Sequence, residues 1–238
     1  MKRLSGEEKA RYVGAMFARI VPRYDLMNTV MTFGRDAAWR AATVRLAAPP
    51  PGGLALDLAA GTGDLALSLA GCATRPRVVA LDFCPEMLQA AQRKTRSRGL
   101  ASRVHLVLGD ATCLPLSDAI FHCATMGFAL RNVADIPQTL AEIHRVLRPG
   151  GRFANLELTP PPSGLLAALF RLYFYRAVPL IGGLISGDPE AYTYLPHSLT
   201  RFPRASELAS LMRAAGFTVV SYRLLAARTI AIHLAIKR

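Results

Sequence analysis

The stretch that decides the fold is Leu54-Ala55-Leu56-Asp57-Leu58-Ala59-Ala60-Gly61-Thr62-Gly63-Asp64. A short apolar run ends near an acid, two glycines flank a threonine, and a helical pattern begins at Leu65. This order predicts a strand, a tight glycine loop and a helix, the arrangement that brings a backbone close to a nucleotide-type ligand. The helix N-terminus adds backbone N–H groups to the same place. We therefore predict that this stretch forms the cofactor site of an α/β enzyme.

The identity of the cofactor depends on charge as well as on the glycines. Residues 61–66 match the dinucleotide fingerprint G-x-G-x-x-G/A, and Asp82 follows Thr62 by 20 residues, where a ribose-binding acid is expected. However, Asp57 and Asp64 flank the loop and would repel a pyrophosphate. The same acids would attract the ammonium and sulfonium groups of S-adenosylmethionine, which we therefore favour. A βα turn without any ligand is the plainer alternative.

Strand and helix patterns alternate after this loop. Strands are predicted at 54–58, 77–82, 104–108, 120–126 and 152–158, with helices over 85–98 and 135–147. This alternation indicates a doubly wound, mostly parallel sheet. Two further strands, 217–225 and 229–236, are joined by only three residues and so form an antiparallel hairpin. Such a seven-stranded α/β sheet is typical of Rossmann-like class I methyltransferases.

Two helical regions flank this core within one predicted domain. Residues 1–50 read as an N-terminal helical cap interrupted at Pro22. Residues 160–204 interrupt the alternation and contain a long apolar segment, 164–186, which is punctuated by the glycine pair 182–183 and by Gly-Asp-Pro at 187–189. Arg171, Arg176 and the mid-segment Pro179 argue against a membrane span. We interpret residues 160–204 as an inserted helical lid over the 54–158 core, with 205–238 completing the sheet.

Three acids occupy equivalent positions at the carboxyl ends of predicted strands. Asp57, Asp82 and Asp110 each end a strand, and ligands of such sheets bind at this edge. Asp82 is suited to the ribose hydroxyls, Asp110 with Ala111 to the adenine edge, and Asp57 to the ammonium group. We predict that these residues bind the cofactor.

Composition restricts the class of partner. The chain has 29 Lys and Arg against 16 Asp and Glu, a net charge of +13, which suits an anionic membrane surface or a nucleic acid. No aromatic residues interleave the basic run 93–98, so we do not predict nucleic-acid binding. The four cysteines show no metal-ligand spacing and no signal peptide is evident, so we predict a cytoplasmic protein without a metal.

Several segments together resemble the C-methyltransferases of ubiquinone and menaquinone biosynthesis. They are Arg-Tyr-Asp-Leu-Met-Asn at 23–28, the 57–64 stretch, Gly-Phe-Ala-Leu-Arg-Asn-Val at 127–133, and the segments 187–195 and 230–233. Gly127 and Ala129 stand where the family usually has serine and glycine. Ala227-Arg228 stands where it usually has two glycines before the last strand.

The resemblance implies methylation of a ring carbon of a polyprenylated quinol, namely demethylmenaquinol or the equivalent ubiquinone precursor. It implies peripheral contact with an anionic membrane and allows a homodimer. It assigns catalysis to Arg131, whose permanent charge would stabilise a phenolate; a structural ion pair with Asp135 is the alternative. It adds cofactor-binding and substrate-binding residues, which are Gly61, Thr62, Gly63, Phe83 and Gly127 for the cofactor and Tyr24, Asn28, Tyr192, Tyr194 and His233 for the substrate.

Three other functions stay open at this point. A methyltransferase of another lipophilic or secondary-metabolite acceptor would share the cofactor half. An NAD-dependent dehydrogenase would use the same glycine loop. A non-catalytic membrane-binding module would keep the fold alone.

Overall fold

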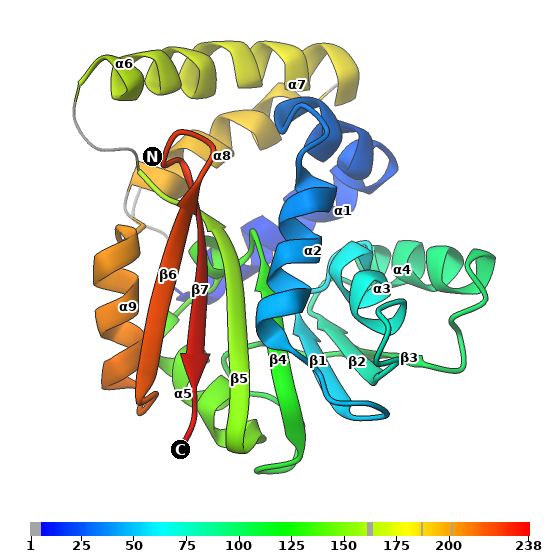
Figure 1. Ribbon diagram of the computed structural model, residues 1–238. Coiled ribbons are helices and arrows are strands. Elements are labelled where there is room, and N and C mark those ends of the chain that lie inside the picture. The colour runs from blue at the N-terminus through cyan, green and yellow to red at the C-terminus, as the bar shows by residue number, and fades with distance from the viewer. Residues whose placement is uncertain (1–5, 161–163, 187, 201) are drawn as a thin grey trace.

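A computed structural model describes residues 6–160, 164–186, 188–200 and 202–238, so Gly187 of the lid segment lies outside the described residues. The described residues form a seven-stranded sheet in the order β3-β2-β1-β4-β5-β7-β6 (Figure 1). Its strands are β1 (Leu54–Leu58), β2 (Arg77–Asp82), β3 (Val104–Leu108), β4 (Phe121–Gly127), β5 (Leu147–Leu158), β6 (Val219–Leu225) and β7 (Ile230–Ile236). Strands β1 to β5 pair in parallel, and β7 is antiparallel to β5 and β6. The predicted sheet is confirmed.

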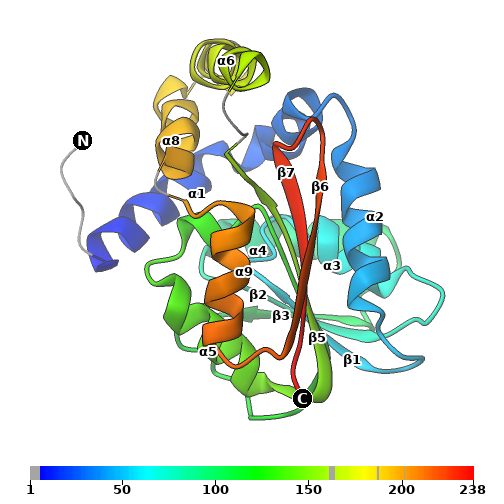
Figure 2. The same cartoon turned by 60° about the vertical axis from the view of Figure 1, so that its left-hand side comes forward.

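Helices cover both faces of this sheet. One face carries α2 (Asp36–Ala47), α3 (Asp64–Ala70) and α4 (Pro85–Ser97), and the other carries α5 (Ile136–Val146) and α9 (Ala205–Ala214) (Figures 1 and 2). Successive residues of the central strands are therefore buried on both faces, as Ala55 and Leu56 of β1 are. This explains why β1 is almost continuously apolar in sequence rather than alternating.

The strand order reverses between β1 and β4, which are neighbours in the sheet although β2 and β3 separate them in the chain. In doubly wound sheets, ligands bind outside the carboxyl ends of the strands at such a switch point. Asp57 pairs here with Thr125 of β4, and the glycine loop follows directly. The fold thus places the 57–64 stretch where a cofactor is expected.

The N-terminal cap contains one long helix, α1 (Gly6–Met31), which leads into α2 (Figure 2). The predicted interruption at Pro22 is wrong, because α1 continues through it. A proline inside a helix removes a backbone hydrogen bond and costs about 3 kcal/mol. Burial of Met16 and Met27, on either side of Pro22, offsets this cost by anchoring both halves of α1 in the core.

The lid lies above the carboxyl edge of the sheet (Figure 1). Its outer part is an uninterrupted helical run, 165–186, made of α6 (Leu165–Leu172), the π-helical turn η2 (Tyr173–Ala177) and α7 (Val178–Ser186); α8 (Pro189–Thr200) follows. The predicted interruption at the glycine pair is therefore wrong, and Pro179 also lies within the continuous helical run. The wide π-helical turn ends at Ala177, two residues before Pro179. At Gly182, a Cβ would lie 2.2 Å from Cγ of Tyr192, so the glycine lets α7 pack directly on α8.

The outer face of this run is apolar and exposed. Length and composition alone would let Ala167–Ile185 cross a membrane, and only 17% of that window is buried. Its exposed large apolar side chains include Leu165, Leu172, Leu180 and Leu184. The two arginines predicted to oppose a span, Arg171 and Arg176, are also exposed.

The turn between β6 and β7 is strained. Ala226, Ala227 and Arg228 have φ values of 48°, 52° and 68°, which are left-handed conformations. For residues with a side chain this conformation costs about 1–2 kcal/mol each. The chain thus tightens this turn without the glycines that usually favour it.

Candidate active site

The glycine loop fixes the carboxylate at the end of β2. Gly61 (φ +56°) and Gly63 (φ +87°) both have left-handed backbones, and a Cβ on Gly63 would lie 3.1 Å from Cβ of Ala91. The N–H of Gly61 donates to Oδ2 of Asp82 at 2.7 Å, and the N–H of Cys84 donates to Oδ1 at 2.9 Å. Each carboxylate oxygen keeps a further lone pair. Asp82 can therefore accept the two hydroxyls of a ribose, as predicted from its position.

A narrow cavity of about 60 Å³ opens beside Asp82. Phe83, Asp110 and Ala111 line it together with Asp82, so the predicted nucleoside residues are brought together. Helix α1 closes one side, since a Cβ on Gly14 would lie 3.0 Å from Cε2 of Phe83. An acid for the hydroxyls and apolar walls for a base suit a nucleoside.

Asp57 lies deep at the switch point. The hydroxyl of Thr125 donates to its Oδ1 at 2.7 Å, while its Oδ2 is buried without a hydrogen-bond partner of normal geometry in the described part of the chain. Burial raises the pKa of Asp57 to about 7, against the opposing effects of Thr125 and the Ala66 backbone. An ammonium group would stabilise the ionised form and satisfy Oδ2. These residues therefore fit an amino-acid-bearing cofactor such as S-adenosylmethionine.

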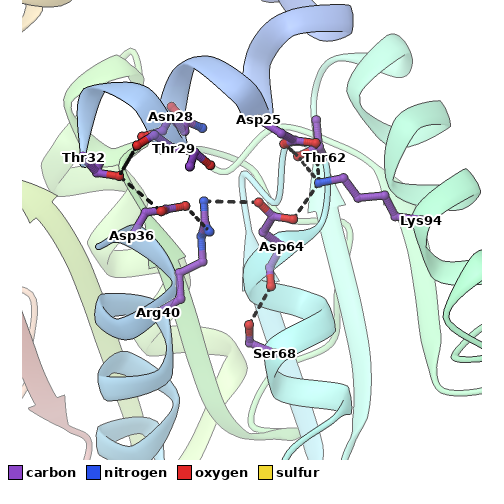
Figure 3. Close-up of polar contacts among 10 residues, drawn as sticks. All are labelled: Asp25, Asn28, Thr29, Thr32, Asp36, Arg40, Thr62, Asp64, Ser68 and Lys94. Atoms are coloured by element: carbon purple, nitrogen blue, oxygen red, sulfur yellow. Dashed lines mark hydrogen bonds and ion pairs between the residues drawn. The ribbon is translucent and has the colours of Figure 1, made fainter. Parts of the chain in front are cut away.

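An ion-pair network ties α1 to the glycine loop (Figure 3). Nζ of Lys94 lies 2.6 Å from Asp64 and 2.7 Å from Asp25, and Arg40 lies 3.2 Å from Asp64. The hydroxyl of Thr62 donates to Asp25 at 2.6 Å and accepts from Lys94 at 2.9 Å.

This network corrects the charge argument made for Asp64 and limits the role open to Thr62. Asp64 is neutralised by Lys94 and Arg40, so it does not supply the free negative charge used to argue against a pyrophosphate. The side chain of Thr62 holds α1 rather than a ligand, which leaves its backbone for the cofactor. Sequence reasoning missed Lys94 and Asp25, because their partners are distant in the chain.

A second, larger cavity of about 520 Å³ lies under the lid. Its volume falls in the range of small-molecule sites. Four predicted residues line it, namely Tyr24, Asn28, Arg131 and Tyr192. Most other lining residues are apolar, and they include Met16, Phe17, Ile20, Trp39, Phe128, Leu158, Leu169, Phe170, Tyr173, Phe174, Ala226 and Ala227.

Tyr24 joins the two parts of the site. A Cβ on Gly61 would lie 3.8 Å from Cε1 of Tyr24, so the wall of the larger cavity touches the glycine loop. Burial raises the pKa of Tyr24, while a hydrogen bond from Asn28 and the charge of Arg131 oppose this rise. The Tyr24 phenol is therefore neutral at physiological pH and lies within the field of Arg131.

Arg131 does not make the predicted alternative ion pair with Asp135. Its guanidinium forms a buried ion pair with Glu157 of β5, and Nη1 also donates to the carbonyl oxygen of Phe128 at 2.6 Å. Asp135 instead caps α5 by accepting from the N–H of Gln138. Phe128 has a φ of 57°, an unusual value for a bulky residue, so Arg131 holds a strained turn at the cavity wall.

Seven predicted residues line neither cavity, namely Asp57, Gly61, Thr62 and Gly63 at the glycine loop and Gly127, Tyr194 and His233 elsewhere. His233 is buried on β7, where its Nε2 lies 2.8 Å from the carbonyl oxygen of Ala205. Burial lowers its pKa, so the ring is neutral. The ring of Tyr194 packs on Tyr12 with centroids 5.9 Å apart. A Cβ on Gly127 would lie 3.3 Å from Leu65, which indicates a packing role. Since Gly127, Tyr194 and His233 line neither cavity and do not belong to the glycine loop, we leave them out of the proposed site.

Comparison with known proteins identifies the family. The model of the ubiE/COQ5 methyltransferase family matches residues 4–237. The chain belongs to the ubiE/COQ5 methyltransferase family. It is therefore an S-adenosylmethionine-dependent methyltransferase, and the dehydrogenase and non-catalytic alternatives are set aside. No group of three His, Cys, Asp or Glu side chains within the described ranges is arranged to hold a metal ion.

Relatives within this family are similar over almost their whole length. A demethylmenaquinone methyltransferase of Thermus thermophilus is 47% identical over 92% of this chain and 98% of its own. A demethylmenaquinone methyltransferase from a Roseiflexus species is 47% identical over 98% of this chain and 96% of its own. A ubiquinone/menaquinone biosynthesis C-methyltransferase of Desulfotalea psychrophila is 42% identical over 94% and 90%.

Solved structures share the fold at low identity. The [4+2]-cyclase SpnF superposes with a TM-score of 0.73 at 18% identity, covering 98% of this chain and 96% of its own. A methyltransferase from Thermotoga maritima, described as a possible histamine N-methyltransferase, gives 0.65 at 19% identity, covering 95% and 100%. Since a cyclase shares this fold, the fold alone does not define the reaction.

Proposed function

We propose that this enzyme methylates a ring carbon of demethylmenaquinol and that the lid cavity binds this acceptor. The Thermus and Roseiflexus relatives, both named demethylmenaquinone methyltransferases, support this acceptor. The observation that carries the proposal is the contact between the larger cavity and the glycine loop at Tyr24. An acceptor ring in this cavity would lie beside the cofactor, while the apolar walls would hold the start of an isoprenoid tail.

Arg131 is proposed to act on the acceptor. S-adenosylmethionine supplies a methyl group activated by its sulfonium, so the protein must mainly place and activate the ring carbon. A ring hydroxyl has an ordinary pKa of about 10, and losing its proton makes the ring electron-rich. The guanidinium of Arg131, which lines the cavity, would stabilise the developing phenolate. Tyr24, Asn28 and Tyr192 are proposed to orient the ring.

Peripheral attachment to the cytoplasmic face of a membrane is part of the proposal. The side chains of Leu165, Leu172, Leu180 and Leu184 are 63–82% exposed on the lid, an arrangement that suits an apolar environment. Exposed Arg171 and the net charge of +13 suit anionic headgroups. Such contact would bring the lid cavity to a substrate whose tail is dissolved in lipid.

An acceptor panel tests the substrate. The purified enzyme is assayed with demethylmenaquinol, a demethoxyubiquinol-type precursor and a simple phenolic metabolite, and the products are identified by mass spectrometry. The proposal predicts a C-methylated product with the highest kcat/KM for demethylmenaquinol. A higher kcat/KM for the phenolic metabolite would favour a secondary-metabolite enzyme instead. That alternative is supported by Gly127, Ala129 and Ala227, which stand where the family usually has other residues.

A further inference from the structure

Glu157 is a buried carboxylate that lies behind the wall of the larger cavity. Glu157 lies near the carboxyl end of β5, between the apolar residues Leu156 and Leu158, and it is fully buried. Charged residues are rarely buried in the middle of a sheet unless they are paired. Glu157 does not line either cavity. Whatever it does for the reaction must therefore pass through a neighbour.

That neighbour is Arg131. The two side chains form an ion pair in which both are almost inaccessible, with 5% and 1% of their side-chain surfaces exposed. Oε1 of Glu157 accepts from Nη1 of Arg131 and from the N–H of Leu158, while Oε2 accepts from the N–H of Arg131 at 3.3 Å. The carboxylate thus holds both the backbone and the guanidinium of one residue.

Stability alone gives a weak reason for such a pair. Replacing a buried ion pair by apolar residues of similar volume is often neutral or stabilising, because removing both charges from water is costly. Here the pair is buried beside the larger cavity. Arg131 lines that cavity, and Glu157 does not. Glu157 also balances a charge that would otherwise be buried beside apolar walls.

We propose that Glu157 is a positioning residue that holds the Arg131 guanidinium at the wall of the acceptor cavity. This inference rests on the proposed role of Arg131. Glu157 fixes the direction of the guanidinium through Oε1 and fixes the start of the 130–132 turn through Oε2. The guanidinium is thereby preorganised, so that no reorganisation is needed when negative charge develops on the ring.

The test compares single and double variants in turnover and in cofactor binding. Glu157→Gln keeps the shape and removes the charge, and we expect kcat to fall about 10–100-fold, as when other orienting partners are lost. The KM for demethylmenaquinol and the Kd for S-adenosylmethionine should change less than threefold. In an Arg131→Ala background, Glu157→Gln should cause no further fall in kcat, because its effect passes through the missing guanidinium.

Controls separate positioning from loss of fold. Glu142→Gln removes a carboxylate from another ion pair, 2.7 Å from Arg145, and should leave kcat unchanged. If Glu157→Gln does not bind S-adenosylmethionine, Glu157→Asp replaces it, since this variant keeps the charge and withdraws the carboxylate by one methylene. A lower kcat with intact cofactor binding is then expected, and a wild-type kcat would overturn the inference.

The outcomes distinguish this inference from the proposed function. Wild-type kcat in Glu157→Gln, or independent losses from the two substitutions that multiply in the double variant, would overturn the positioning role. If Arg131→Ala is inactive while Glu157→Gln is fully active, only the inference fails. If Arg131→Ala itself keeps a near-normal kcat, the proposed role of Arg131 fails and the inference fails with it.

Discussion

The acids at the strand ends differ in environment, and this difference sets what each can do. Asp57 is buried with its pKa raised to about 7, so below that pH it is mostly neutral and above it mostly ionised. Asp82 is held by the backbone N–H groups of Cys84, Gly61 and Phe83, which oppose the rise in its pKa caused by burial. Asp57 is therefore suited to pair with a positive charge of the ligand, and Asp82 is suited to accept hydrogen bonds from hydroxyl groups.

The raised pKa of Asp57 predicts a pH-dependent affinity for S-adenosylmethionine. Since only the carboxylate attracts the ammonium group, which itself loses its proton at about pH 8, the Kd should be several-fold lower at about pH 7.5 than at about pH 6. Calorimetry at both pH values measures this. Asp57→Asn should abolish most of the difference. A wild-type affinity that does not change with pH would contradict the assignment of Asp57 to the cofactor.

Substitution of Asp82 tests the ribose contact. Asp82→Ala should weaken S-adenosylmethionine binding by about 1.5–3 kcal/mol, the scale of hydrogen bonds to a charged group. Calorimetry gives the change, and circular dichroism checks the fold. Asp118→Ala removes an exposed carboxylate that pairs with Arg145 and serves as the control. An unchanged Kd in correctly folded Asp82→Ala would remove this residue from the site.

Local sequence predicted some of these residues and not others. Asp57, Asp82 and the glycines follow from spacing within one βα unit, which the sequence displays directly. The Arg131–Glu157 pair joins the 130–132 turn to β5 across 26 positions of the chain, so no local pattern reveals it. A glutamate inside the apolar run 153–158 was the available signal, because a buried acid needs a partner. The charge of Asp64 was misjudged for the same reason, since its ion-pair partners Lys94 and Arg40 are distant from it in the chain.

At the scale of elements, the strands were predicted more accurately than the helices at the cofactor edge. Alternation and glycine turns place every strand of the sheet. Proline was a poor guide to helix ends, because α1 continues through Pro22 and the lid helix through Pro179. Packing of both helices over the site outweighs the local cost of the proline. The exact helical length thus depends on tertiary contacts that a sequence does not display.

The β6–β7 turn gives a prediction about stability. Ala227→Gly relieves a left-handed residue and should raise the free energy of unfolding by about 0.5–1 kcal/mol, after the entropy cost of glycine is subtracted. Denaturant unfolding at an unchanged m-value measures it. Ala101, which is not among the residues with positive φ, provides the control. Ala101→Gly should lower stability by about 0.4–1 kcal/mol. A loss of stability in Ala227→Gly would show that the turn is not strained.

At the scale of the whole molecule, charge and the apolar lid predict salt-sensitive membrane binding. The protein should float with anionic liposomes at low salt and be released as salt is raised, because screening weakens the headgroup attraction. Leu172→Glu combined with Leu184→Glu should abolish flotation. Val219→Glu, at an exposed apolar position on edge strand β6, should not. Full binding by the double lid variant would place the membrane contact elsewhere.

The homodimer that the family resemblance allows stays a prediction. Sedimentation equilibrium over a range of concentrations would give the mass directly.

The most direct test of the account is the dependence of kcat on pH in Arg131→Ala. Loss of a preorganised donor should lower kcat for demethylmenaquinol by about 10²–10³ with little change in cofactor affinity. Raising the pH should restore part of this activity, because hydroxide then ionises the ring hydroxyl without help. Arg131→Lys keeps the charge but not the planar group, so its kcat should lie between those of the wild-type enzyme and Arg131→Ala. A near-normal kcat in Arg131→Ala, or an equal loss at every pH in a folded variant that binds S-adenosylmethionine, would contradict the proposed role of Arg131 at the acceptor.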